Sequence, residues 1–265
     1  MRIAYKGMNE YALVTGASKG IGREIALLLA RSGYHLLLVA RSEAELQQLA
    51  KLINETYKVH AFYLPIDLSV EKAADQVANW CKEQTPSLSV LINNAGYGLW
   101  GNFDQLTLAD QMNMLKLNID VVLELSHHLL PVLKQQKQAY ILNISSTAAY
   151  QAVPTLSLYA AGKTFILSYS RALRYELKDS TVSVSCLCPG PTATGFSSRA
   201  GMDALADLAE KFNMSPEIVA EIGLKGMFNK KVEIIPGFLN KISAFGTRLL
   251  PKSLIERITA RLYQQ

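Results

Sequence analysis

Tyr11-Ala-Leu-Val-Thr-Gly-Ala-Ser-Lys-Gly-Ile-Gly22 is the stretch of this 265-residue chain that decides its fold. Its first five residues are an apolar run that ends at a glycine, which is typical of a buried parallel strand. Three closely spaced glycines follow, and residues 23–31 have the pattern of a helix. Because a strand, a glycine turn and a helix place backbone N–H groups and a helix N-terminus against a phosphate, the stretch predicts nucleotide binding.

Strand and helix patterns alternate along the rest of the chain. Strands are expected at residues 35–40, 59–66, 88–92, 138–145, 181–187 and 231–235, and helices at 42–57, 70–84, 106–132 and 155–178. The alternation predicts an α/β fold, a Rossmann-like doubly wound parallel β-sheet of about seven strands with helices on both faces. With 49% hydrophobic residues, the chain is expected to form a single domain over residues 1–265.

Charge and cysteine content narrow the function classes. The net charge of +5 comes from scattered Lys and Arg, which disfavours nucleic-acid binding and suits a phosphate-bearing ligand. No stretch approaches the roughly 20 apolar residues of a membrane span, and residues 1–6 lack a signal-peptide core; Met1 and Met8 are both possible starts.

Cys81, Cys186 and Cys188 form no even disulfide framework, so we expect core thiols in a reducing cytoplasm. No metal site is expected, because the histidines lack a ligand-like arrangement; they are His35, His60, His127 and His128.

Two cations predict which nucleotide is bound. Arg41 ends the second strand, where this architecture meets the adenosine ribose, and it can pair with a 2′-phosphate. Lys19 in the glycine turn adds a second cation, so both favour NADP(H) over NAD(H). The alternative is that Arg41 is merely an exposed loop residue. Ser42 then begins a helix, with Glu45 at the spacing of a capping box.

Polar residues also end the third and fourth strands. Asp67, followed by Leu68, either accepts a hydrogen bond from an adenine amino group or caps the helix expected at 70–84. Asn93-Asn94-Ala95-Gly96 follows the fourth strand. Two amides and a glycine at this place can join the strand tips and leave backbone exposed to a sugar.

The candidate chemistry lies in residues 145–163. Tyr159 and Lys163 are four residues apart, so on a helix they share one face. A cation against a phenol favours the phenolate, which brings a tyrosine toward the range of a general acid or base. Ser146, at the end of the fifth strand, can hold a substrate oxygen. Asn118 lies inside a helical pattern that an Asn disfavours, so either its side chain has a partner or the helix is interrupted there.

Two further segments border this region. Cys188-Pro-Gly-Pro-Thr-Ala-Thr-Gly195 is a stiff loop whose backbone can approach a flat ligand. Residues 196–228 are a candidate substrate lid, with Ser215 and Pro216 starting a helix. Its apolar side chains suggest a medium to large apolar ketone or aldehyde, although the same residues could be core: Phe196, Met202, Leu205, Leu208, Phe212 and Met214.

Residues 236–265 form a basic amphipathic C-terminal extension. Apolar residues recur at helical spacing (Phe238, Leu239, Ile242, Phe245 and Leu249), with basic residues between them (Lys241, Arg248, Lys252, Arg257 and Arg261). We expect this extension to pack on its own domain or on a partner subunit. Peripheral contact with an anionic membrane is the alternative.

Taken in order, these pieces resemble the short-chain dehydrogenase/reductase family over roughly residues 10–235, in its NADP-preferring branch. The match is carried by Thr15–Gly22, Asn93–Gly96, Asn118, Ser146 13 residues before Tyr159, Lys163 and Pro189-Gly190. The resemblance implies that Tyr159 is the acid/base, that Lys163 lowers its pKa and binds the nicotinamide ribose, that Ser146 orients the substrate oxygen and that Asn118 supports a proton-relay water. The expected cofactor-binding set is Gly16, Ser18, Lys19, Gly20, Ile21, Gly22, Arg41, Asp67, Leu68, Asn94, Ala95, Gly96, Tyr159, Lys163, Pro189, Gly190, Thr192 and Thr194.

The sequence thus predicts a cytoplasmic NADP(H)-dependent carbonyl reductase or alcohol dehydrogenase. The resemblance also implies a homodimer or homotetramer that packs the helices around Asn118 and Tyr159 across a four-helix interface. One alternative is a reductase of 3-oxoacyl thioesters on an acyl carrier protein. Another is a non-catalytic sensor that binds NADP(H) without turnover, which the intact Ser146, Tyr159 and Lys163 argue against.

Overall fold

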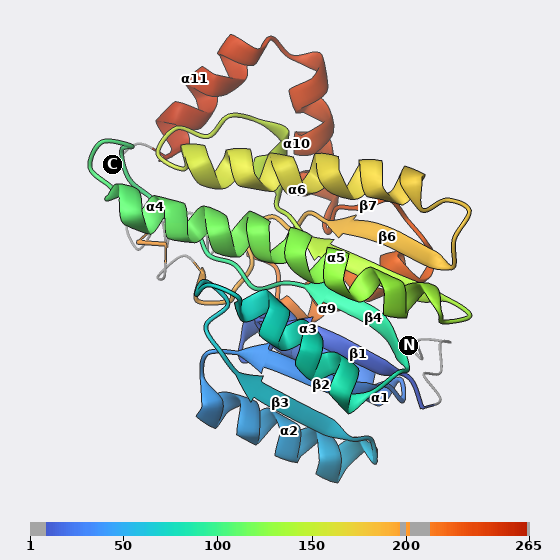
Figure 1. Cartoon of the computed structure of the whole chain (residues 1–265). Helices are drawn as coiled ribbons and strands as arrows, with labels where there is room; N and C mark the ends of the chain where they lie inside the picture. Colours follow the sequence, from blue (N-terminus) through green and yellow to red (C-terminus); the bar gives the residue numbers. More distant parts are fainter. Residues whose placement is uncertain (1–8, 197–199, 202–212, 264–265) are drawn as a thin grey trace.

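The computed structural model describes residues 9–196, 200–201 and 213–263, and its centre is one parallel sheet of seven strands (Figure 1). The strands are β1 (Tyr11–Thr15), β2 (His35–Ala40), β3 (Ala61–Pro65), β4 (Leu88–Asn93), β5 (Ala139–Ile144), β6 (Val182–Leu187) and β7 (Glu233–Ile234). Their order across the sheet is β3-β2-β1-β4-β5-β6-β7. The predicted doubly wound sheet is confirmed. Its order reverses between β1 and β4, the position where such folds bind ligands at the carboxyl ends of the strands.

Helices cover both faces of the sheet (Figure 1). They are α1 (Gly20–Arg31), α2 (Glu43–Tyr57), α3 (Ala73–Gln84), α4 (Leu108–Leu115), α5 (Val121–Lys134), α6 (Ser157–Glu176), α9 (Pro216–Phe228), α10 (Phe238–Leu249) and α11 (Lys252–Tyr263), with a π-helix η1 (Lys116–Asp120) and a 3-10 helix η2 (Thr147–Tyr150). Helices α1, α2 and α9 share a core with one face, and α3 and α5 share a core with the other.

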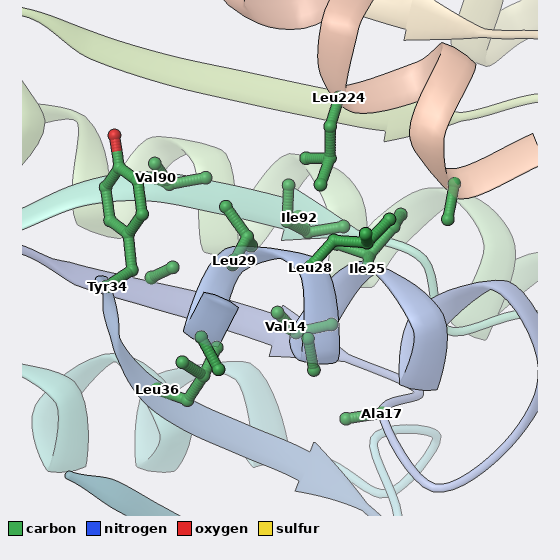
Figure 2. Packing of buried hydrophobic residues seen from close by; sticks show 14 of the residues in the cluster. Val14, Ala17, Ile25, Leu28, Leu29, Tyr34, Leu36, Val90, Ile92 and Leu224 are labelled. Atoms are coloured by element: carbon green, nitrogen blue, oxygen red, sulfur yellow. The ribbon is translucent and has the colours of Figure 1, made fainter. Parts of the chain in front are cut away.

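The strands read as continuous apolar runs because both of their faces are buried. Along β1, Ala12 and Val14 point into the core under α1 and α9, while Leu13 between them points to the α3 and α5 side. Figure 2 shows the first of these cores, in which Ile25 and Leu29 of α1 and Leu224 of α9 lie over the sheet. The two cores hold the sheet as a rigid platform, so the strand ends have fixed positions.

One hydroxyl group joins the tips of β1 and β4 at the point where the strand order reverses. Thr15 Oγ1 donates to the Ile92 carbonyl (3.1 Å) and accepts from the backbone N–H groups of Asn94 (2.9 Å) and Ala95 (3.1 Å). The Asn94 side-chain amide donates to the carbonyls of Thr15 (2.9 Å) and Gly16 (3.2 Å). Asn94 therefore joins the strand tips, as its position predicts, and it also fixes the start of the glycine turn.

Some predicted boundaries and contacts are wrong for local reasons. Helix α1 begins at Gly20, inside the glycine motif, and α3 begins only at Ala73, after Lys72 in a left-handed conformation. Ser42 is the N-cap residue of α2, as predicted, but the capping box is absent, because the Ser42 side chain makes no cap hydrogen bond and the Glu45 carboxylate pairs with Lys19. The last strand has only two residues.

Part of the candidate lid, residues 197–199 and 202–212, lies outside the described residues, and this part includes Met202, Leu205, Leu208 and Phe212. The part that is described confirms the helix start at Ser215, whose side chain accepts a hydrogen bond from Ile218 N. The C-terminal extension is helical, as its spacing predicts, but it does not bury the predicted apolar residues on its own domain. All five are exposed: Phe238, Leu239, Ile242, Phe245 and Leu249.

Two helical glycines give a matched test of this packing. A Cβ at residue 22 in α1 would overlap the Gly16 carbonyl oxygen and the Asn94 side-chain nitrogen, whereas a Cβ at residue 162 in α6 would meet only side-chain carbons at 3.5 Å or more. We expect Gly22→Ala to lower the free energy of unfolding by about 2 kcal/mol or more, and Gly162→Ala to raise it by up to about 1 kcal/mol. Urea unfolding of both variants measures this. Equal changes in the free energy of unfolding for the two variants would contradict the close packing of Gly16 and Asn94 against Gly22.

Candidate active site

Helix α6 presents Tyr159 and Lys163 one turn apart, as their spacing predicts. Both side chains are buried. The Lys163 Nζ atom lies 5.7 Å from the centre of the Tyr159 ring and donates a hydrogen bond to the Ile144 carbonyl at 3.0 Å. Ser145 Oγ donates to the Lys163 carbonyl at 2.7 Å, which ties the end of β5 to α6. The ammonium group is therefore held between the phenol ring and the end of a central strand.

Burial sets the charge state of Lys163. Desolvation lowers its pKa to about 8, and the electrostatic influence of Cys186 and Cys188 opposes part of that shift. The side chain thus carries its proton at neutral pH but gives it up more readily than an exposed lysine. Cys186 and Cys188 are buried with their sulfur atoms 3.8 Å apart, so the prediction of two core thiols on one face is confirmed.

Ser146 leaves β5 and starts η2, close to where α6 begins. Its Oγ accepts a hydrogen bond from Ala148 N at 3.1 Å, and the next residue, Thr147, donates its N–H to the Pro189 carbonyl at 2.9 Å. The backbone N–H occupies one lone pair of the Ser146 hydroxyl, whose own proton is a donor for a further acceptor. The half-buried hydroxyl is held at the strand-end edge of the sheet, as predicted.

Asn118 lies in the π-helix between α4 and α5, so both alternatives for this residue hold: the helix is locally altered and the side chain has a partner. Its Nδ2 donates to the Tyr97 carbonyl at 2.8 Å, and its Oδ1 accepts from Tyr97 N at 3.1 Å. A Cβ at Gly96 would lie 2.6 Å from Asn118 Oδ1 and 3.6 Å from Lys163 Nζ. Both side chains therefore border the space that a side chain at residue 96 would occupy. Single-turn π insertions of this kind are frequent at functional sites.

The glycine turn has the geometry of a phosphate cradle. Gly16 and Gly20 adopt φ values of +64° and +55°, which favour glycine. Lys19, the residue before α1, provides no side-chain cap. The first N–H groups of the helix therefore donate to no side-chain oxygen at the N-cap position and can donate to a phosphate. Ser18 lies in the glycine turn, and Ile21 and Gly22 belong to the first turn of α1.

The loop after β6 closes over the glycine turn. A Cβ at Gly20 would lie 2.9 Å from the Thr194 Cβ. Thr192 Oγ1 donates to the Gly190 carbonyl at 2.9 Å, and Thr194 Oγ1 donates to the Thr192 carbonyl at 3.3 Å. The predicted cofactor residues of the two loops therefore meet across the end of the sheet, with the buried Pro189 beneath them.

The two predicted 2′-phosphate cations each have an acidic neighbour. Lys19 Nζ lies 2.7 Å from Glu45 Oε1, and Arg41 Nη1 lies 3.9 Å from Asp67 Oδ2, with both cations largely exposed. The hydrogen bond from Lys19 is the largest cause that lowers the pKa of Glu45. A pocket of about 410 Å³ borders this pair and is lined by Ser18, Lys19, Arg23, Glu45, Gln48, Leu49 and Leu52.

Asp67 does not cap α3, so that alternative is wrong. Its Oδ1 accepts from Ser69 N (2.9 Å) and Ser69 Oγ (2.7 Å), and the helix starts six residues later. The adenine contact of Asp67 stays a prediction. Leu68 is buried in the core under α3, so only its backbone can face a cofactor.

Apolar side chains surround Tyr159 on the substrate side. Phe196, from the start of the predicted lid, lies with its ring centre 5.5 Å from that of Tyr159 and within contact of Gly98. The buried cluster here also contains Met114, Val153, Leu156 and Ala160, with Tyr97, Leu99 and Trp100 beside it. Among the described residues, the pocket beside Tyr159 has a volume of only about 10 Å³, close to that of one water.

Sequence reasoning missed the contacts of four residues at this site. Thr15 could have been found, because a threonine before the turn is a polar residue at a buried strand end. Glu45 has the spacing of a cap, which gives no hint of its pairing with Lys19. Tyr97 and Asn240 gave no signal, because Tyr97 acts through its backbone and Asn240 packs its amide against Gly190 from a distant helix. Within the described residues, no group of three or more His, Cys, Asp or Glu could hold a metal ion.

The chain is similar to known proteins in sequence. A family model described as short chain dehydrogenase matches residues 10–205. The chain is 33% identical to sulfoacetaldehyde reductase 2 of Chromohalobacter salexigens over 81% of its own length and 87% of that protein. It is 34% identical to a very-long-chain 3-oxoacyl-CoA reductase of Laccaria bicolor over 67% of its own length, but spans only 53% of that protein.

A solved structure agrees with these relatives. A short-chain dehydrogenase from Sphingobium yanoikuyae, in complex with NADPH, superposes with a TM-score of 0.81 at 29% identity, covering 93% of this chain and 94% of the other. The family model alone covers β1 to β6 and α6. The chain therefore belongs to the short-chain dehydrogenase family of nicotinamide-dependent oxidoreductases.

Proposed function

We propose that this chain transfers a hydride between NADP(H) and an apolar ketone or aldehyde, or the corresponding alcohol, with Tyr159 as acid/base. The observation that carries the proposal is the buried Lys163 ammonium beside the Tyr159 ring. An ammonium group at this position stabilises a negative charge on the phenol oxygen. Proton exchange at a substrate oxygen is the chemistry that such a tyrosine can perform.

The residues present fit a dinucleotide. The turn at Gly16, Gly20 and Gly22 leaves space that a Cβ would fill, and the N-terminus of α1 points at it. Gly96 likewise keeps the backbone open beside Lys163. When bound, the nicotinamide supplies the hydride or accepts it, and the protein supplies binding, orientation and the proton.

The roles of the other side chains follow from their contacts. The Ser146 hydroxyl can donate to the substrate oxygen, because a backbone N–H already orients its lone pair. Tyr159 then exchanges the proton with that oxygen. Asn118 makes two hydrogen bonds to the Tyr97 backbone and so fixes the neighbouring Gly96, beside which a cofactor can approach. We propose that Asn118 also supports a water molecule that relays protons.

The apolar cluster around Tyr159 supports an apolar substrate. Phe196 occupies the space over the tyrosine ring, and we propose that it moves aside when substrate enters. A second candidate substrate is compatible with the same apolar cluster around Tyr159: a 3-oxoacyl thioester, whose acyl chain is apolar. The likeness to the 3-oxoacyl-CoA reductase of Laccaria bicolor favours that candidate. Turnover of acetoacetyl thioesters but not of simple ketones would select it.

The exposed cations Lys19 and Arg41 support the preference for NADP(H), and the NADPH complex of the Sphingobium relative agrees with it. We also propose a cytoplasmic location, which the free, buried thiols of Cys81, Cys186 and Cys188 support. A homodimer or homotetramer is proposed from the family resemblance.

The acid/base role is tested with two matched substitutions on α6. Tyr159→Phe removes only the hydroxyl that exchanges the proton, so we expect kcat to fall by about 10²- to 10⁴-fold while NADPH affinity stays unchanged. Tyr175→Phe makes the same change at an exposed position of the helix and should have wild-type kinetics. NADPH fluorescence titration and turnover of a panel of ketones and aldehydes measure both. Undiminished turnover by Tyr159→Phe would exclude the assignment.

The buried Lys163 predicts a pH-dependent stability cost. Its folded pKa of about 8 lies below the roughly 10.4 of an unfolded lysine, so between these values the unfolded state binds more protons and stability rises with pH. Lys163→Met removes the cost, and we expect it to be more stable than wild type by about 1–3 kcal/mol at pH 7, with the difference shrinking toward pH 10. It should also be inactive.

Urea unfolding of wild type and Lys163→Met at pH 7 and pH 10 gives this difference directly. Lys178→Met, at an exposed lysine just beyond α6, is the control and should show no pH-dependent gain. A Lys163→Met difference that stays constant with pH would mean that the lysine is not carrying a desolvated charge.

The cofactor preference is tested at both ion pairs. Arg41→Asp replaces a cation by an anion, so we expect the ratio of NADPH to NADH affinity to fall by at least about tenfold.

Glu45→Gln frees Lys19 from its carboxylate, so we expect the ratio of NADPH to NADH affinity to rise by about two- to fivefold, since the pair is exposed. Glu55→Gln, on the same helix and paired with Lys51, is the matched control. Equal affinities of the wild type for both nucleotides would end the proposal.

A further inference from the structure

Helix α10 turns its apolar side toward solvent. Phe238, Ile242, Phe245 and Leu249 recur at spacings of four, three and four residues and so lie on one side of the helix, which we call the apolar stripe. Their side chains are 75%, 53%, 61% and 70% exposed, respectively. Amphipathic helices of globular proteins normally point such a stripe into the core, so this orientation is the reverse of the usual one.

The opposite side of α10 is small and polar, and it is the side that faces the protein. Ala244 is buried. The Asn240 side chain packs on Gly190, where a Cβ would come within 2.5 Å of its oxygen, and Asn240 Nδ2 donates to the Pro236 carbonyl at 2.8 Å. These contacts fix the rotation of the helix, so the apolar stripe cannot turn inward without breaking them.

Helix α11 extends the same surface. Ile255 and Thr259 are buried, whereas Leu254 and Ile258, one residue earlier in each case, are exposed, and so is Leu250 in the connection between the helices. Figure 1 shows α10 and α11 at one outer end of the molecule, beyond α6 and far from α2. The exposed apolar side chains of both helices thus belong to one projecting end of the protein.

Positive charge is concentrated in the same segment. Residues 236–263 contain five basic residues and one acidic residue, Glu256, which gives +4 of the net +5 of the whole chain. The basic residues are Lys241, Arg248, Lys252, Arg257 and Arg261. A second copy docked on this surface would bring two segments of charge +4 together, which is unfavourable, whereas an anionic partner would be attracted.

We propose that α10 and α11 dock on the surface of an anionic lipid bilayer, with the apolar stripe in the headgroup region and the basic residues against lipid phosphates. Exposed apolar side chains flanked by Lys and Arg are what interfacial helices present to such a surface. None of the described helices is long and apolar enough to cross a membrane, so the contact is peripheral. This inference concerns the C-terminal segment and stands whether or not the proposed substrate is correct.

Sedimentation with vesicles tests the proposal on the full chain. We expect binding to vesicles of phosphatidylcholine with phosphatidylglycerol at low salt, weaker binding as salt increases, and little binding to phosphatidylcholine alone. Phe245→Ser with Leu249→Ser should weaken the binding by at least about tenfold. Lys241→Gln and Lys252→Gln should each weaken it about fivefold.

Exposed residues elsewhere provide the controls. Phe62→Ser on β3 and Lys51→Gln on α2 make the same kinds of change at the opposite end of the sheet from β7 and should leave vesicle binding unchanged. Failure of the wild-type chain to bind anionic vesicles at low salt would overturn the proposal. So would sedimentation velocity showing that the Phe245→Ser, Leu249→Ser variant dissociates a dimer, because the surface would then be an interface between copies of this chain.

Discussion

The three hydrogen bonds of the Thr15 hydroxyl set the position of the whole site. They join β1 to β4 where the strand order reverses, and they use the donor and both acceptor positions of one side chain. The Asn94 amide adds bonds to Thr15 and Gly16 and fills the volume that any side chain at residue 22 would need. The glycine turn, the start of α1 and the backbone leading to Gly96 are consequently fixed by one polar junction, on a sheet that two apolar cores hold rigid.

A second constraint works against stability. The Lys163 ammonium is buried and donates a hydrogen bond to the Ile144 backbone carbonyl, and burial lowers its pKa to about 8. A methionine of similar length would avoid the desolvation of a charge. The lysine is therefore best understood through what it does for Tyr159, since its contribution to the folded state is unfavourable at neutral pH. Natural proteins commonly retain such costs at functional sites.

Much of this could be predicted because it depends on local pattern. Buried strands read as apolar runs, and the spacing of Tyr159 and Lys163 on a helix places them together without knowledge of the fold. The failures concern side-chain partners that the local pattern does not specify. Glu45 has the spacing of a cap, but Lys19 from another turn competes for its carboxylate. Asp67 precedes a helix, but its carboxylate accepts hydrogen bonds from the N–H and hydroxyl groups of Ser69, so it does not cap that helix. Asn118 is indicated both by an Asn being unfavourable in a helix and by the family resemblance, but its partner, the Tyr97 backbone, carries no sequence signal.

The C-terminal extension shows why amphipathic spacing alone leaves the direction of a helix open. The pattern of α10 identifies an apolar side, but the tight approach of Asn240 to Gly190 decides that this side faces outward. Gly190 belongs to the loop whose Thr194 closes over the glycine turn. A lipid surface that binds the apolar stripe would thus be separated from this loop by the thickness of α10, about 10 Å. For an apolar carbonyl compound, which partitions into a bilayer, this arrangement would place the site near the phase that contains its substrate.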